Sequence, residues 1–148
     1  MPELKRILLA EDSANDLELT LAALEENRLA NGVVAVRDGA EALDYLYRRG
    51  AYANRTGGNP ALVLLDLKMP KVDGMEVLRQ IKQDEELHRI PVVMLTSSRE
   101  EQDLLRSYDL GVNAYVVKPV AFTAFMEAVR QLGGFWAIIN EPPPVGAL

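Results

Sequence analysis

Short runs of apolar residues alternate with longer amphipathic segments along the whole chain. The short runs have almost no polar interruption, which is typical of strands buried on both faces of a parallel sheet. The longer segments repeat apolar residues every three or four positions, and this spacing predicts helices. Five strands are predicted, at 7–10, 33–36, 61–66, 91–95 and 114–117.

Capping residues and glycines mark the ends of the predicted helices. Ser13 with Asp16, and Ser98 with Glu101, fit the capping box, in which a serine and an acid three residues later satisfy backbone amides at a helix start. Glycines follow several of the amphipathic segments, as expected at helix ends. Five helices are predicted: one from Ser13 to about Asn31, and others at 39–49, about 74–84, 98–111 and 122–133.

Five strands that alternate with five helices predict a three-layer α/β sandwich with right-handed crossovers. A flavodoxin-like, doubly wound (βα)5 parallel sheet with strand order 2-1-3-4-5 is the expected solution for five such units. Ligands bind such sheets beyond the carboxyl ends of the strands, at the point where the strand order reverses. Here that point lies between the first and third strands, where Glu11, Asp12 and Asp66 would meet.

The length of 148 residues suits one domain, predicted at 1–134, followed by a C-terminal extension at 135–148. The extension contains Phe135, Trp136 and two isoleucines before a run of prolines. These apolar residues either pack on the domain's own core or form a dimer interface. The connection at 50–60 is long for a helix-to-strand link, where about 2–6 residues is usual, so it is either functional or a tolerated insertion.

Composition excludes several classes of function. The net charge of −6 disfavours binding to nucleic acid or to an anionic membrane surface, since both require basic patches. The chain has no cysteine and a single histidine, His88, so thiol catalysis, cysteine–zinc sites and multi-histidine metal sites are excluded. No segment reaches the roughly 18 apolar residues of a membrane span, and the N-terminus lacks a signal-peptide core. The predicted location is therefore the cytoplasm.

Four of the predicted strands each deliver a polar residue to the same edge of the sheet, and the residues are Glu11 with Asp12, Asp66, Thr96 and Lys118. Each has a structural explanation of its own, as a helix cap, a partner for a helix dipole or a solvated strand end. Their coincidence at the edge where this fold class binds ligands favours a functional site instead.

The predicted cluster has an excess of negative charge. Three carboxylates within a few ångströms repel one another, and Lys118 offsets only one of them. A hard divalent cation would balance the remainder, and an all-oxygen ligand set favours Mg²⁺ or Mn²⁺ over zinc. A carboxylate such as Asp66 beside that ion can attack a phosphoryl group and form an aspartyl phosphate. Lys118 and the metal would stabilise the phosphoryl oxygens, and the hydroxyl of Thr96 could donate a hydrogen bond to one of them.

With these residues in place, the sequence resembles the response-regulator receiver domains of two-component systems over roughly residues 4–133. The matching positions are Glu11-Asp12, Asp66 with Met69-Pro70 and Asp73-Gly74, Thr96, and Lys118-Pro119.

The resemblance implies specific roles for these residues. Asp66 would accept a phosphoryl group from a histidine kinase, so the protein would be a phosphoacceptor that catalyses its own phosphorylation and dephosphorylation rather than an enzyme. Asp12, Asp66 and the backbone carbonyl of Lys68 would bind Mg²⁺ directly, with Glu11 acting through water.

The resemblance also implies a switch pair, Thr96 and Tyr115, through which phosphorylation would control binding to partner proteins. Phosphorylation would draw the Thr96 hydroxyl inward, and the Tyr115 ring would follow it. This movement would remodel the face made by the fourth helix, fifth strand and fifth helix, through which we expect a homodimer. Without the resemblance, Tyr115 is equally well explained as an ordinary core aromatic.

Two further features are the long 50–60 loop and the Phe135-Trp136 extension. In both, the chain resembles the single-domain regulators that partner bacterial phytochromes. A stand-alone regulator in light signalling, with a bacteriophytochrome as its kinase, is therefore expected.

Four alternatives remain open. The first is a receiver of the chemotaxis or phosphorelay type, and the second is a degenerate receiver that only binds partners. The third is an aspartyl-phosphate phosphatase, but that class needs Asp-x-Asp where this chain has Asp66-Leu67-Lys68. The fourth is a flavin mononucleotide carrier, but Glu11 and Asp12 would repel its phosphate.

Overall fold

The computed structural model describes residues 6–26 and 32–132, and every strand and helix that the hydrophobic pattern predicts is present there. Five parallel strands form one sheet in the order β2-β1-β3-β4-β5, which confirms the predicted flavodoxin-like α/β fold. In chain order the elements are β1 (Ile7–Ala10), α1 (Ala14–Glu25), β2 (Val33–Val36), α2 (Gly39–Tyr47), the short 3-10 helix η2 (Gly50–Tyr52), β3 (Leu62–Asp66), α3 (Gly74–Gln83), β4 (Val92–Thr96), α4 (Arg99–Ser107), β5 (Ala114–Val117) and α5 (Phe122–Gln131).

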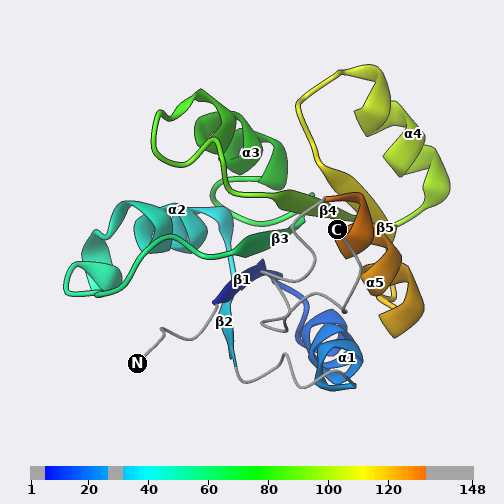
Figure 1. Cartoon of the computed structure of the whole chain (residues 1–148), viewed down its shortest axis with the longest axis horizontal. Coiled ribbons are helices and arrows are strands. Elements are labelled where there is room, and N and C mark those ends of the chain that lie inside the picture. Colours follow the sequence, from blue (N-terminus) through cyan, green and yellow to red (C-terminus); the bar gives the residue numbers. More distant parts are fainter. Residues whose placement is uncertain (1–5, 27–31, 133–148) are drawn as a thin grey trace, which may run out of the picture.

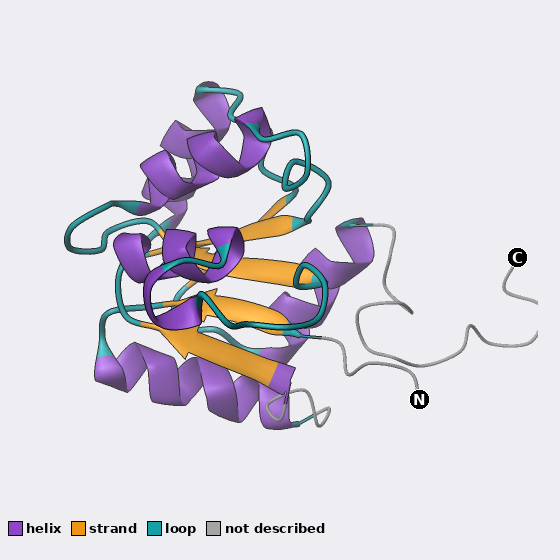
Figure 2. Cartoon of the chain, turned by 90° about the vertical axis from the view of Figure 1, so that its left-hand side faces the viewer, coloured by secondary structure: helices purple, strands orange, loops and turns teal. Residues whose placement is uncertain are grey.

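Helices cover both faces of the sheet, so the molecule has the three layers expected (Figures 1 and 2). On one face, Leu24 of α1 and Phe125 of α5 belong to a single core cluster with alternate strand residues. On the other face, Leu46 of α2 and Ile81 of α3 belong to a second cluster with the remaining strand residues. Burial of a leucine or phenylalanine side chain stabilises the fold by roughly 1.5–3 kcal/mol, so the two clusters hold the sheet in place.

The central strand β3 is buried along its whole length, including its last residue, Asp66. An apolar strand in this position is enclosed by helices on both faces, which explains its uninterrupted apolar sequence. A buried carboxylate at its end needs compensating partners, because an ionised group is costly to remove from water. The fold therefore requires positive charge or hydrogen-bond donors beside Asp66 at this edge of the sheet.

Some predicted boundaries differ from those observed. The second helix ends at Tyr47 rather than Arg49, because Arg48 adopts a left-handed conformation with φ of 55°. The fourth helix ends at Ser107 rather than Gly111, and Asp109 then turns the chain with φ of 50°. The predicted end of the first helix near Asn31, the domain boundary at 134, and the extension at 135–148 lie outside the described residues.

No helix in the described ranges has both the length and the apolar character that a membrane crossing requires.

Gly74 is required by a close approach of two backbone segments. The helix α3 begins directly against the end of β3, and the Gly74 N–H donates a hydrogen bond to the Leu67 carbonyl at 2.8 Å. A Cβ atom at Gly74 would overlap the carbonyl oxygen of Asp66 and the Cα of Leu67. The glycine therefore lets α3 pack closely enough to fix the backbone of Asp66.

We predict that Gly74→Ala destabilises the protein by about 1–3 kcal/mol, because the new methyl group must displace buried backbone. Gly58→Ala is the matched control, since a Cβ there would meet nothing within 4 Å. The control should change the free energy of unfolding by no more than about 0.5 kcal/mol in urea denaturation. Equal stability of the two variants would contradict the close approach.

Candidate functional site

The register of the sheet places the predicted acidic residues side by side. Ala10 of β1 is paired with Leu65 of β3, so the residues that follow them, Glu11 and Asp66, leave the two strands at the same level. The backbone N–H of Glu11 still donates to the sheet, with the Val36 carbonyl at 3.0 Å, and this bond fixes its position. The edge at which the strands end is the one predicted to bind a ligand.

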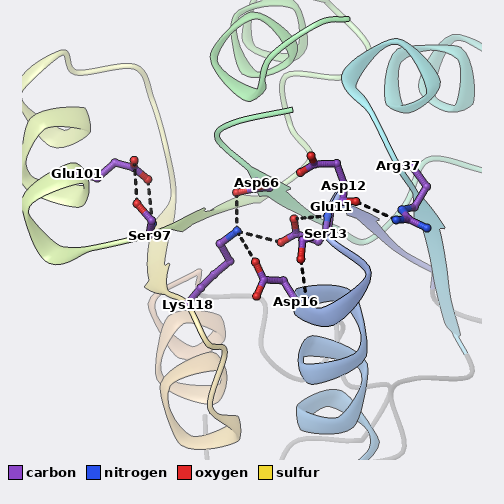
Figure 3. Close-up of polar contacts among 9 residues, drawn as sticks. All are labelled: Glu11, Asp12, Ser13, Asp16, Arg37, Asp66, Ser97, Glu101 and Lys118. Carbon is purple, nitrogen blue, oxygen red and sulfur yellow. Dashed lines mark hydrogen bonds and ion pairs between the residues drawn. The ribbon is translucent and has the colours of Figure 1, made fainter. Parts of the chain in front are cut away.

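Glu11, Asp12 and Asp66 converge there as the sequence predicts (Figure 3). Each offers one carboxylate oxygen, and these three oxygens lie within 4.8 Å of one another. Glu11 and Asp66 are buried, whereas Asp12 is exposed. The cluster offers only oxygen ligands, which is the donor set that Mg²⁺ and Mn²⁺ prefer, so these residues fit the predicted metal.

The ammonium group of Lys118 connects the buried acids. Its Nζ lies 3.0 Å from Oδ1 of Asp66, 3.2 Å from Oε1 of Glu11 and 3.1 Å from Oδ2 of Asp16. Backbone geometry holds the lysine in place, because its N–H donates to the Thr96 carbonyl at 2.7 Å. The side chain is only 14% exposed, so these ion pairs are poorly screened by solvent.

Asp16 is the member of the site that the sequence interpretation missed. The predicted capping box is only half formed, because the Ser13 hydroxyl accepts from the Asp16 N–H but the Asp16 carboxylate contacts Lys118 instead. Glu11 accepts from the Ser13 N–H at 3.2 Å in its place. Asp16 lies in the first turn of a helix that begins at the ligand-binding edge of the sheet. This position in the sequence was the signal that could have placed Asp16 in the site.

The four acids leave the site with more negative charge than the sequence alone indicated. If all were ionised, Lys118 would offset one of them, and three negative charges would remain. Arg37 contributes nearby positive charge by donating to the Asp12 carbonyl at 2.8 Å. Burial, together with the neighbouring Asp66 carboxylate, raises the pKa of Glu11 to about 7. Burial alone would lower the pKa of Lys118, but its hydrogen bonds to Asp66 and Asp16 outweigh this effect and raise that pKa.

Thr96 and Tyr115, the predicted switch pair, lie on neighbouring strands. The Thr96 hydroxyl is fully buried and has no hydrogen-bond partner among the described residues. Leaving a buried hydroxyl unpaired is unfavourable. An acceptor that entered the site could receive a hydrogen bond from the Thr96 hydroxyl and remove this cost. Tyr115 is partly buried, and the Arg106 guanidinium of α4 lies 4.5 Å from the centroid of its ring. This cation–π contact ties the tyrosine to α4.

Lys68 extends away from the acid cluster toward α4. Its side chain is 80% exposed, and its Nζ lies 3.6 Å from Oε2 of Glu101. Glu101 also accepts hydrogen bonds from the backbone N–H and the hydroxyl of Ser97. The predicted capping box is therefore half formed: the Ser98 hydroxyl accepts from the Glu101 N–H, but the Glu101 carboxylate bonds to Ser97 instead of to the Ser98 N–H. A cavity of about 580 Å³ beside the cluster is lined by Asp12, Lys68 and neighbouring residues.

Comparison with known proteins identifies the architecture. Residues 7–130 match the family model of the response regulator receiver domain. Response regulator Rcp1 from Synechocystis sp. is 42% identical over 132 residues, which is 89% of this chain and 88% of Rcp1. Among solved structures, the bacteriophytochrome response regulator AtBRR is 66% identical, with a TM-score of 0.88 over 95% of this chain and 100% of that one. The bacteriophytochrome response regulator RtBRR is 60% identical, with a TM-score of 0.87 over 98% and 89%.

Two other solved structures represent chemical states relevant to this site. The phosphorylated cyanobacterial phytochrome response regulator RcpA is 44% identical, with a TM-score of 0.72 over 91% of this chain and 95% of RcpA. The Mn(2+)-bound form of Rcp1 is 41% identical, with a TM-score of 0.70 over 90% of this chain and 94% of Rcp1.

We predict that Mg²⁺ stabilises this protein through Asp12. A ligand that binds only the folded state stabilises it by about 2.7 kcal/mol at a hundred times its Kd. Asp12→Asn should remove most of this gain while stabilising the metal-free protein slightly, by less than about 1 kcal/mol, because it relieves repulsion.

The measurement is urea denaturation with and without Mg²⁺. Asp103→Asn is the matched control, since Asp103 is an exposed acid on α4 outside the cluster. If Mg²⁺ stabilised the Asp12→Asn variant as much as the control, Asp12 would not be a ligand.

Proposed function

The chain belongs to the response regulator receiver family, and we propose that Asp66 is the residue that accepts the phosphoryl group. The observation that supports this role is its position: a buried carboxylate at the end of the central strand, 3.0 Å from the Lys118 ammonium and inside the acid cluster. Proteins of this family act in phosphorylation-dependent signalling, and a related structure, RcpA, was solved in its phosphorylated form.

The proposed metal is Mg²⁺ or Mn²⁺. Asp12, Asp66 and the Lys68 carbonyl would hold it directly, with Glu11 contributing through water. When bound, the metal neutralises negative charge on the phosphoryl oxygens and on the carboxylates. The all-oxygen donor set and the Mn²⁺-bound form of the relative Rcp1 support this assignment.

The proposed reaction is a direct phosphoryl transfer. A carboxylate oxygen of Asp66 attacks the phosphorus of a phosphohistidine on the kinase, the phosphorus–nitrogen bond breaks, and the released imidazole takes up a proton. Lys118, already at the Asp66 carboxylate, would bind a phosphoryl oxygen, and the unpaired Thr96 hydroxyl would donate to another. The protein's contribution is mainly to position these groups and balance their charge.

We propose a bacteriophytochrome as the histidine kinase that supplies the phosphoryl group. The support is the similarity to AtBRR and RtBRR, both described as bacteriophytochrome response regulators. The proposed location is the cytoplasm, where such a donor would draw phosphate from ATP.

We further propose that phosphorylation remodels the face formed by α4, β5 and α5 and that two copies pair through it. Leu104 and Tyr108 at α4 are each 56% exposed, and their exposed apolar surface supports the proposal that this face makes a contact. The Arg106–Tyr115 contact connects this face to the switch pair. Residues of the 135–148 extension are proposed to add to the dimer.

The phosphoacceptor assignment is tested by intact-protein mass spectrometry after incubation with acetyl phosphate and Mg²⁺. The wild-type chain should gain the mass of one phosphoryl group, and Asp66→Asn should gain none. Asp103→Asn, on α4, should behave as the wild type. Phosphorylation of the Asp66→Asn variant to the wild-type extent would contradict the assignment.

The switch is tested by light scattering with Mg²⁺ and beryllofluoride, a phosphoryl mimic. We expect the wild type to become dimeric and Thr96→Ala to bind the mimic but stay monomeric, because the hydroxyl that draws Tyr115 inward is missing. Thr56→Ala, at the opposite edge of the sheet, is the matched control. A wild-type protein that stays monomeric at high concentration, with and without the mimic, would refute the dimer.

A further inference from the structure

A cavity of about 840 Å³ lies at the edge of the sheet opposite the acid cluster. Its lining comes from the loop between α2 and β3 (Figure 1), together with Arg6 before β1, Val34 of β2 and Ala61 before β3. Arg6, Tyr45, Tyr52, Arg55 and Asn59 are among the residues that line it. The volume falls within the roughly 300–1,000 Å³ range of pockets for small organic ligands. The unusually long 50–60 loop therefore encloses a space of ligand size.

The charge of this cavity is opposite to that of the whole chain. Among the described residues, its lining contains two arginines and no carboxylate, although the chain has a net charge of −6. Arg55 forms no ion pair within residues 6–26 and 32–132, whereas the nearby Arg49 is paired with Asp44 at 2.9 Å. An uncompensated guanidinium in a partly enclosed space attracts anions strongly, because solvent screens it less than it would at an open surface.

Arg55 is held rigidly by its surroundings. Its Nε donates to the Tyr45 carbonyl and its Nη1 donates to the Gly58 carbonyl, each at 3.0 Å. The guanidinium lies 4.2 Å from the centroid of the Tyr45 ring. The third nitrogen, Nη2, is buried and has no hydrogen-bond partner among the described residues. A buried charged donor without an acceptor is unfavourable, so an oxygen acceptor at Nη2 would stabilise the site, and a negatively charged one would stabilise it most.

We propose that this cavity binds a small organic anion, and that Arg55 recognises its phosphate or carboxylate group. Arg6 adds a second positive charge at the cavity wall, and the ring of Tyr52 provides an apolar surface for the body of the ligand. Because Nη2 is buried and the adjacent Nη1 is bonded to the Gly58 carbonyl, we expect the 55–59 segment to shift when an acceptor reaches Nη2. Binding should therefore change the environment of the backbone amides in that segment.

The site is independent of the proposed phosphorylation of Asp66. It lies at the amino-terminal edge of the parallel strands, and the acid cluster lies at their carboxyl edge. Substitutions at one edge should therefore leave binding at the other unchanged, and the two proposals can fail separately.

The test is a titration of the ¹⁵N-labelled full chain followed by NMR. The probes are inorganic phosphate, citrate, guanosine monophosphate and uncharged guanosine, so that phosphate and carboxylate groups are compared with each other and with a neutral ligand. We expect the anions, and not guanosine, to shift amides of residues 45–61. Whichever of citrate and guanosine monophosphate binds more tightly identifies the anionic group.

Arg55→Gln should weaken binding by about tenfold or more, because it removes a charged hydrogen-bond donor. Arg99→Gln, an exposed arginine at the start of α4, and Asp66→Asn should both leave binding unchanged. If Arg55→Gln does not fold, Arg6→Gln removes the second positive charge of the cavity instead, and weaker binding is again expected.

The absence of shifts with every anion would overturn the proposal. Shifts that map elsewhere on the protein, or that persist at full affinity in the arginine variants, would overturn it as well.

Discussion

The structure of the site depends on one ammonium group shared among three carboxylates, two of which are buried. Lys118 contacts Asp66, Glu11 and Asp16, which come from the end of β3, the end of β1 and the first turn of α1. The two buried acids, Glu11 and Asp66, could not remain ionised without such a partner. One lysine cannot balance them all, however, and burial together with the neighbouring Asp66 carboxylate raises the pKa of Glu11. A site of this kind stays receptive to a cation and to a transferred phosphoryl group, because each brings the charge or the hydrogen-bond acceptor that the site lacks.

The rest of the fold brings these groups to one point. Parallel strands in register end at a common edge, and the absence of a side chain at Gly74 lets α3 pack against the backbone of Asp66. The same topology places the loops that enter the strands at the other edge, where the long 50–60 segment encloses a cavity with a positive lining. The molecule therefore has an acid cluster at one edge of the sheet and, at the other, the arginine-lined cavity for which anion binding is proposed. In the face made by α4, β5 and α5, the contact between Arg106 and Tyr115 joins α4 to β5, and the ion pair of Lys68 with Glu101 links α4 to the loop that follows Asp66.

Much of this could be predicted from the sequence, because strand ends in a parallel sheet are easily recognised. Once the strand order was assigned, Glu11, Asp12, Asp66, Thr96 and Lys118 had to face the same edge, and the structure brings them together there. Asp16 was missed because a serine three residues earlier gave its carboxylate a sufficient role as a cap. The contact of Arg106 with Tyr115 could not be predicted, since it depends on how α4 is rotated against β5, and apolar spacing alone does not fix that rotation. The charge of the 50–60 cavity was hidden for a similar reason: its arginines are far apart in the sequence, and only the fold places both of them in the lining of one cavity.

The most direct test of the account is a crystal structure of the protein grown with Mn²⁺, in which the anomalous signal locates the ion. The account predicts a single strong peak in contact with the carboxylates of Asp12 and Asp66 and with the carbonyl of Lys68, while the Lys118 ammonium remains at the buried acids. A peak elsewhere, or carboxylates of Asp12 and Asp66 that point away from each other with no ion between them, would contradict it.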